Sequence, residues 1–200
     1  KYVLPFGHKR LGNLKIEDLN VEPSEIINLP SCDSRLSLWN MRFFVELLRN
    51  QKGWKRSEKR QKRNIFKKLN PLKVYLFFRF LGLPIIFNIF TFIINKKLTK
   101  NPNLSLNSLL KKENPDVIIH PSVLRGIYIN DLVDSGNNMK IPVVVIMNSW
   151  DNPCSKRSVV SNNYKLLVWG PQSRNHAERL MSMDPENIIE FGAAQFDVYK

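Results

Sequence analysis

Four short apolar runs in the second half of the chain, bounded by proline, glycine or polar residues, predict buried β-strands. The runs are Val117–His120, Ile141–Met147, Tyr164–Trp169 and Asn187–Phe191. Helices are predicted around them at 104–112, at 123–135 with Gly136 as its end, and from Pro171 to about Met183. Continuous apolar strands that alternate with helices are typical of a parallel sheet. We therefore predict an α/β fold: a Rossmann-like parallel sheet with helices on both faces.

The first half has a weaker pattern and an uneven charge. Short strands are predicted at Tyr2–Pro5 and Glu25–Pro30, and apolar side chains recur at helical spacing between Leu36 and Leu48. Residues 52–73 then hold ten lysines and arginines against one acid. That segment supplies most of the net charge of +14.

The most apolar stretch of the chain, residues 74–94, directly follows this basic segment, and three lysines follow the apolar stretch at 96, 97 and 100. Basic residues beside phenylalanine and isoleucine favour an anionic membrane surface over nucleic acid, for which no recognition motif is present. The apolar stretch is long enough to span a membrane, but Arg79, Pro84 and Asn88 interrupt it. A solvated basic helix followed by a buried core helix or hairpin is the alternative. The residues expected to contact the membrane are Lys55, Arg56, Arg60, Arg63, Phe77, Phe78, Phe80 and Phe87.

Composition excludes several classes of protein. At 200 residues with 43% hydrophobic and 24% charged side chains, the chain is neither disordered nor a repeat array. Cys32 and Cys154 lie far apart, which excludes a zinc ribbon and suggests a reducing compartment. The three histidines lack metal-type spacing, so we expect no metal site. No glycine-rich phosphate loop and no serine-hydrolase elbow is present.

Polar side chains gather where predicted strands end, and ligands of α/β proteins bind beyond the carboxyl ends of the strands. The loop at 148–156 reads Asn-Ser-Trp-Asp-Asn-Pro-Cys-Ser-Lys. Asp151 could orient a hydroxyl, Lys156 could neutralise a phosphate, and Trp150 could cover a sugar or a base. The alternative is a turn held by Asx-type hydrogen bonds. His120 ends a predicted strand at the same edge and is a candidate general base, or else a structural hydrogen-bond partner.

Three segments between residues 115 and 199 resemble bacterial glycosyltransferases of the two-Rossmann-domain (GT-B) architecture. The likeness is greatest to those of surface polysaccharide synthesis and to their CDP-glycerol glycerophosphotransferase-like relatives. The segments are the strand and loop Pro-Asp-Val-Ile-Ile-His-Pro-Ser at 115–122, the Ser-Trp-Asp-Asn-x-x-Ser-Lys motif at 149–156, and Val-Trp-Gly-Pro-Gln at 168–172 with Gly-x-x-x-Phe-Asp-x-Tyr at 192–199. Ala194 departs from the proline that is common in the family, which affects the turn more than the chemistry.

The resemblance implies a particular place for this chain in a two-domain enzyme. Residues 1–191 would form the N-terminal, acceptor-side domain, with 52–100 as a membrane-facing insertion and 192–200 as the start of the interdomain linker. The C-terminal nucleotide-binding domain would lie outside the chain, so this fragment would be inactive alone. Gly192, Phe196 and Asp197 would lie between the domains.

The resemblance also sets the expected activity: transfer of a sugar from a nucleotide-sugar donor to a lipid-linked or surface-polysaccharide acceptor, without a cofactor. The enzyme would be cytoplasmic and peripheral at the inner face of the plasma membrane. Polyol-phosphate transfer from a CDP-linked donor, or a non-catalytic peripheral membrane module, are the alternatives. The loop becomes an expected cleft element, with His120 and Asp151 as catalytic candidates. The substrate-binding candidates are Ser149, Trp150, Asn152, Ser155, Lys156 and Gly170.

Overall fold

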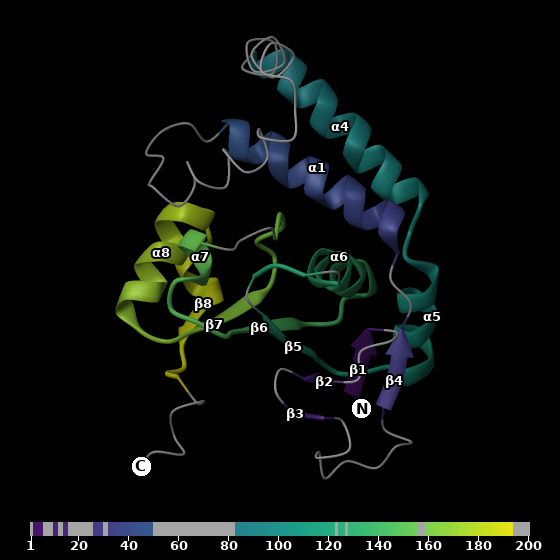
Figure 1. The fold of residues 1–200 in the computed structure, drawn as a ribbon. Coiled ribbons are helices and arrows are strands. Elements are labelled where there is room, and N and C mark those ends of the chain that lie inside the picture. Colours follow the sequence, from purple (N-terminus) through teal and green to yellow (C-terminus); the bar gives the residue numbers. More distant parts are fainter. Residues whose placement is uncertain are drawn as a thin grey trace.

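The four apolar runs of the second half form one parallel sheet with the strand order β5-β6-β7-β8 (Figure 1). The computed structural model describes residues 2–5, 10–11, 14–15, 26–29, 32–49, 83–122, 124–126, 128–155 and 159–193. The sheet consists of β5 (Ile118–Ser122), β6 (Val143–Met147), β7 (Lys165–Val168) and β8 (Ile188–Glu190). This confirms the parallel sheet and the α/β class that the apolar runs predict.

The chain also forms helices α5 (Leu104–Glu113), α6 (Ile129–Met139), α7 (Asn152–Ser155) and α8 (Pro171–Met181), and a short 3₁₀ turn η3 at Pro185–Asn187. Every second strand residue packs with apolar side chains of α5, α6 and α8 in the main core. These strand residues form what we call the covered face of the sheet: Ile118, Val143, Val145, Met147, Leu166, Val168 and Ile188.

The opposite face of the sheet, which we call the outer face, is not covered by any helix of the described residues, and Figure 1 shows the helices on one side of the sheet. Ile119 is 60% exposed and Ile189 is 47% exposed. The cause is the strand order: from β5 to β8 each strand adds to the same edge, and right-handed crossovers then place α6, α7 and α8 on one face. The expectation of helices on both faces therefore does not hold for the described residues.

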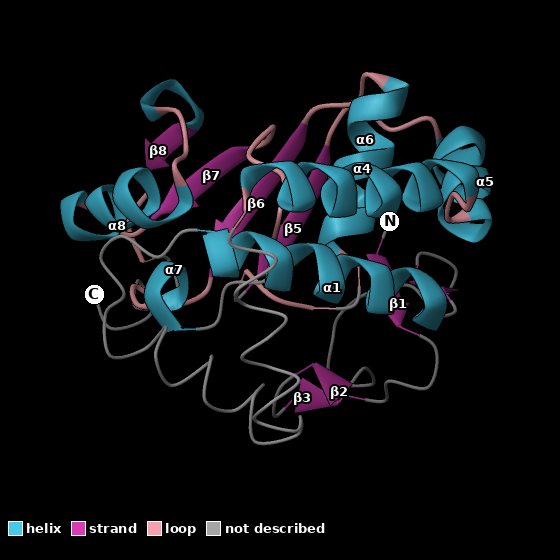
Figure 2. Ribbon diagram, turned by 90° about the horizontal axis from the view of Figure 1, so that it is seen from above, coloured by secondary structure: helices cyan, strands magenta, loops and turns pink. Residues whose placement is uncertain are grey.

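The first half of the chain adds a separate parallel pair, β1 (Tyr2–Pro5) with β4 (Ile26–Leu29), and a small antiparallel pair, β2 (Arg10–Leu11) with β3 (Leu14–Lys15). Both predicted strands at 2–5 and 25–30 are thus present. In Figures 1 and 2 the β1–β4 pair lies on the β5 side of the four-stranded sheet.

Two long helices, α1 (Asp33–Arg49) and α4 (Pro84–Lys100), pack on each other and form the outermost layer above α6 (Figures 1 and 2). Their contact is a second apolar cluster made by Trp39, Val45, Phe87, Ile94 and Leu98. The helical spacing between Leu36 and Leu48 is confirmed by α1. Phe87 is buried in this cluster, so its side chain does not face a surface as we expected. The described residues include no helix that is long and apolar enough to cross a bilayer.

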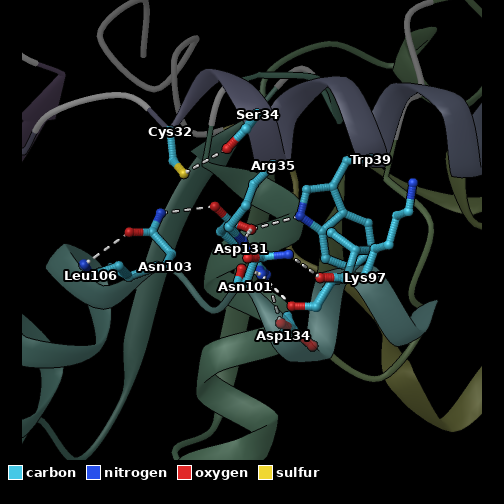
Figure 3. A network of polar contacts seen from close by, with 11 residues as sticks. Cys32, Ser34, Arg35, Trp39, Lys97, Asn101, Asn103, Leu106, Asp131 and Asp134 are labelled. Carbon is cyan, nitrogen blue, oxygen red and sulfur yellow. Dashed lines mark hydrogen bonds and ion pairs between the residues drawn. The ribbon is translucent and has the colours of Figure 1, made fainter. Parts of the chain in front are cut away.

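A buried polar network fastens this helix pair to the rest of the fold (Figure 3). The guanidinium of Arg35 on α1 donates to Asp131 on α6 at 2.8 Å, to Asp134 at 2.9 Å, and to the carbonyl oxygens of Leu98 and Asn101 at the end of α4. Asp131 also accepts hydrogen bonds from the indole of Trp39 at 2.6 Å and from the amide of Asn103 at 2.8 Å. One side chain from α1 therefore joins α1, α4 and α6.

Helix α6 differs from its prediction at both ends. It begins at Ile129 rather than 123, because Leu124 and Gly126 have backbone φ angles of 59° and 157°, which no helix accommodates. Gly136 does not end the helix but lies inside it. A Cβ atom there would come within 2.4 Å of the Val143 side chain, so the glycine permits the close approach of α6 and β6.

Candidate functional site at the carboxyl edge of the sheet

The loop that follows β6 is tied to the end of the neighbouring strand β5. The backbone amide of Asn148 donates to the carbonyl oxygen of Ser122 at 3.0 Å, and the side-chain amide of Asn152 donates to the same oxygen at 3.4 Å. Asn152 is fully buried. Two strand ends that carry polar residues are thus held together at the edge where ligands of parallel sheets bind.

Within this loop, Ser149 and Asp151 form a short polar pair. The hydroxyl of Ser149 donates to Oδ1 of Asp151 at 2.6 Å, and both side chains are half-buried. The backbone turns into α7 through hydrogen bonds from the amide of Asn152 to the Ser149 carbonyl and from the amide of Cys154 to the Asp151 carbonyl. These bonds join backbone to backbone or side chain to side chain, whereas an Asx-type turn, the alternative we considered, is one in which an Asp or Asn side-chain oxygen accepts from a backbone amide. The carboxylate and hydroxyl nevertheless meet beside the 49% exposed indole of Trp150.

A strained residue lies next to this loop. Leu124, two residues beyond β5, is fully buried although its φ angle of 59° lies in the left-handed region. Two hydrogen bonds hold the backbone of Leu124 in this conformation. Its amide donates to the hydroxyl of Ser122 at 2.9 Å, and its carbonyl accepts from the amide of Val159. Such conformations cost on the order of 1–3 kcal/mol and cluster at functional sites. The strain is therefore a second feature, besides the polar loop, that marks this edge.

His120 does not end a strand, because β5 continues through Pro121 to Ser122. Proline has no backbone N–H to donate. Pro121 is tolerated there because β5 is an edge strand of this sheet and pairs with β6 alone. By register His120 lies opposite Val145 on the covered face. Its Nδ1 atom is buried without a hydrogen-bond partner, and burial lowers the pKa of the imidazole below its ordinary value. Burial therefore favours the neutral imidazole, which lies on the covered face of the sheet.

The next two strand ends supply the remaining described candidates. The indole of Trp169, directly after β7, donates to the carbonyl oxygen of Met147 at 2.9 Å and so joins the ends of β6 and β7. Gly170 then precedes α8, and the hydroxyl of Ser173 on α8 lies 3.5 Å from the Trp150 carbonyl. Gly192 follows β8 with a φ angle of 90° and donates to Val168. Gly170 and Gly192 thus both lie at the end of β7, Gly170 directly along the chain and Gly192 through its hydrogen bond to Val168.

Two features of this edge escaped sequence analysis. The thiol of Cys154 on α7 lies 3.2 Å from Nδ1 of His176 on α8, which joins two residues separated by 22 positions. The side-chain oxygen Oδ1 of Asn152 is buried and has no hydrogen-bond partner. No sequence pattern links Cys154 to His176. The sequence places Asn152 in the loop, but the burial of its side chain depends on the contact with the end of β5.

Several candidates lie outside the described residues: Lys156, Phe196 and Asp197 of the site and linker, and Lys55, Arg56, Arg60, Arg63, Phe77, Phe78 and Phe80 of the membrane set. Ser155 ends α7, and its side chain is likewise not described. Among the described histidines, cysteines and acids, no group of three or more is arranged to hold a metal ion.

The arrangement can therefore offer a carboxylate with a hydroxyl partner, an exposed aromatic ring and a buried amide oxygen at one sheet edge. Searches of known protein families, of curated proteins and of solved structures find no match to this chain.

Proposed function

We propose that this chain supplies the acceptor-side domain of a glycosyltransferase that moves a sugar from a nucleotide-sugar donor to a lipid-linked or surface-polysaccharide acceptor. The observation that carries the proposal is the Ser149–Asp151 pair, which lies in the loop after β6 and is tied to the end of β5. This loop contains the Ser-Trp-Asp-Asn-x-x-Ser-Lys motif on which the resemblance rests. It lies at the edge where parallel sheets bind ligands.

The proposed chemistry is a substitution at the anomeric carbon of the donor. The acceptor hydroxyl oxygen forms a bond to that carbon, the bond from the carbon to the phosphate oxygen breaks, and the nucleoside diphosphate leaves with the bonding electrons. The hydroxyl proton passes to a general base, and we assign this role to Asp151. Ser149 is a positioning residue, because its hydroxyl donates to Oδ1 of Asp151. His120 is the weaker candidate, because it lies on the covered face of the sheet and its pKa is lowered by burial.

Other groups of the loop would bind the acceptor. Trp150 exposes about half of its side chain, and an exposed indole suits the apolar face of a sugar ring. Asn152 has a buried oxygen without a donor, and a buried acceptor of this kind is costly unless it is paired. A hydroxyl that enters the loop could donate to it.

A donor panel tests the proposal on the full-length protein that contains this chain. The protein is incubated with labelled nucleotide sugars or with CDP-glycerol, together with a lipid-linked saccharide acceptor, and labelled lipid is measured. We expect transfer from a nucleotide sugar, and a decrease of about a hundredfold or more for Asp151→Asn, because general-base catalysis contributes that much. Asp116→Asn is the matched control, since Asp116 is exposed and precedes β5 at the opposite edge of the sheet.

Product from CDP-glycerol alone would reject sugar transfer in favour of polyol-phosphate transfer. Product formation that is equally low for Asp116→Asn and Asp151→Asn would reject the role of Asp151. An absence of transfer from every donor would reject the enzyme class and leave the non-catalytic interaction module as the better hypothesis.

A further inference from the structure

Helix α4 is apolar on the side that faces away from the protein. Its packing side holds Phe87, Ile94 and Leu98, which are at most 6% exposed against α1. At 100° per residue, four exposed apolar residues and two lysines lie roughly opposite, within an arc of about 100°. We call this arc the outward side of α4, formed by Ile85, Ile89, Phe92, Ile93, Lys96 and Lys100.

The exposure of these side chains is unusual for a surface helix. Ile85 is 73% exposed, Phe92 is 65% exposed, and Ile89 and Ile93 are exposed as well. A surface helix normally presents polar residues to water, as α8 does with Gln172, Asn175 and Arg179. Contiguous exposed apolar side chains on one element mark an interaction surface. Figure 1 shows α4 as the outermost helix of its layer.

The charges of α4 indicate what kind of surface it meets. The helix contains no aspartate or glutamate, and its last turns carry three exposed lysines at 96, 97 and 100. Lys96 lies in line with the apolar residues, and its ammonium is 5.9 Å from the ring centre of Phe92. Long lysine stems can lie along apolar surface while the charge reaches outward. An apolar line that ends in cations is complementary to acyl chains below a layer of negative headgroups.

We propose that the outward side of α4 is a docking surface for an anionic lipid bilayer, on which the helix lies in the plane of the interface. The isoleucines and Phe92 insert at the boundary of headgroups and acyl chains, and Lys96 and Lys100 contact the headgroup phosphates. This surface lies within the 52–100 segment that was expected to face a membrane, but it consists of other residues than the eight named for that contact. Of those eight, Phe87 is buried. The inference does not depend on the proposed sugar transfer, since it rests on α4 alone.

Vesicle flotation of the intact chain tests this docking. Vesicles of phosphatidylcholine alone are compared with vesicles in which about one-third of the lipid is phosphatidylglycerol. We expect flotation with the anionic vesicles. Lys96→Ala with Lys100→Ala should decrease the partition coefficient by about thirtyfold, because each lysine near an anionic surface raises that coefficient by about fivefold. Ile89→Ser with Phe92→Ser should decrease it by at least tenfold, because buried apolar area is lost.

Matched controls distinguish binding through α4 from nonspecific adsorption to the vesicles. Leu104→Ser removes a 70% exposed leucine from α5, and Lys111→Ala with Lys112→Ala removes two exposed lysines from the same helix. These controls should float as the unchanged chain does. All variants concern exposed side chains, and circular dichroism with thermal unfolding verifies that each one folds.

Three results would overturn the proposal. The first is equal flotation with neutral and anionic vesicles, or none with either. The second is unchanged flotation of both α4 double variants, which would assign lipid binding to another part of the chain. The third is a concentration-dependent dimer in sedimentation that the Ile89→Ser and Phe92→Ser pair abolishes, because the outward side would then be covered by a second copy.

Discussion

The Nε atom of Arg35 donates to Oδ1 of Asp131 at 2.8 Å, although the two residues are 96 positions apart in the sequence and each is at most 2% exposed. Both charges have lost their contact with water, and their remaining polar atoms are occupied by Trp39, Asn103, Asp134 and two backbone carbonyls. A buried ion pair is tolerated when its hydrogen bonds are satisfied in this way. The network therefore holds the α1–α4 layer on α6.

Removal of one partner should destabilise the protein strongly. Arg35→Met leaves Asp131 and Asp134 without their cation, and loss of one member of a buried pair costs about 3–5 kcal/mol. Arg42→Met is the matched control on the same helix, because Arg42 pairs with Glu46 at 3.2 Å near the surface and such pairs contribute less than about 1 kcal/mol. Urea unfolding measures both. Equal free energies of unfolding for the two variants would show that the Arg35 network contributes no more than a surface pair.

A second prediction concerns the contact between α6 and β6. Gly136→Ala places a Cβ atom 2.4 Å from Cγ2 of Val143 and 3.1 Å from the backbone oxygen of Ile141. Overpacking of this kind costs about 1–3 kcal/mol, which exceeds the gain from the better helix propensity of alanine. The double variant Gly136→Ala with Val143→Ala should recover part of the loss, because the clashing methyl group is gone. Thermal unfolding in which Gly136→Ala is as stable as the unchanged chain would contradict this contact.

Local patterns explain why the strands and most helices could be predicted. The apolar runs that become β5 to β8 are short, rich in Val and Ile, and bounded by proline or glycine, so each encodes its own structure. Helix α5 has Asn103 as its N-cap, whose side chain accepts from the amide of Leu106. The position of Ser149 and Asp151 at the sheet edge also followed from strand order, since the loop follows the end of β6.

The features that could not be predicted depend on contacts between distant segments. Gly136 ended the predicted helix because glycine is a common helix terminator, but its contact with Val143 keeps it inside α6. The Arg35 network and the Cys154–His176 contact join residues without any local signal. Phe87 belongs to an apolar stretch whose sequence is compatible both with a membrane surface and with a buried core helix. Only the packing of α1 decides which side of that stretch is buried.

The uncovered outer face of the sheet gives a prediction from two neighbouring residues. Ile118 is 9% exposed on the covered face, whereas Ile119 is 60% exposed on the outer face of the same strand. Ile118→Ala should cost about 2–5 kcal/mol, because a core methylene deletion leaves a cavity. Ile119→Ala should cost less than about 1 kcal/mol, as surface substitutions do. Urea unfolding of the two variants compares them directly, and an equally large loss for Ile119→Ala would mean that other residues cover the outer face in solution.

The last prediction concerns pH and His120. Burial lowers the pKa of this imidazole below its ordinary value of 6.5, so the folded chain favours the neutral form and the unfolded chain binds a proton more readily. Stability from this group is therefore fully present above pH 6.5 and decreases as the pH falls below 6.5 toward the lower folded-state pKa. His120→Gln removes that dependence. The free energy of unfolding of the unchanged chain, minus that of the variant, should thus decrease from pH 7.5 to pH 5.5 in urea titrations. Asp134, whose pKa burial raises, is common to both chains, so its effect cancels in the difference. A difference that is constant with pH, or that increases toward acid, would show that the imidazole is solvated or paired with an acid rather than buried in its neutral form.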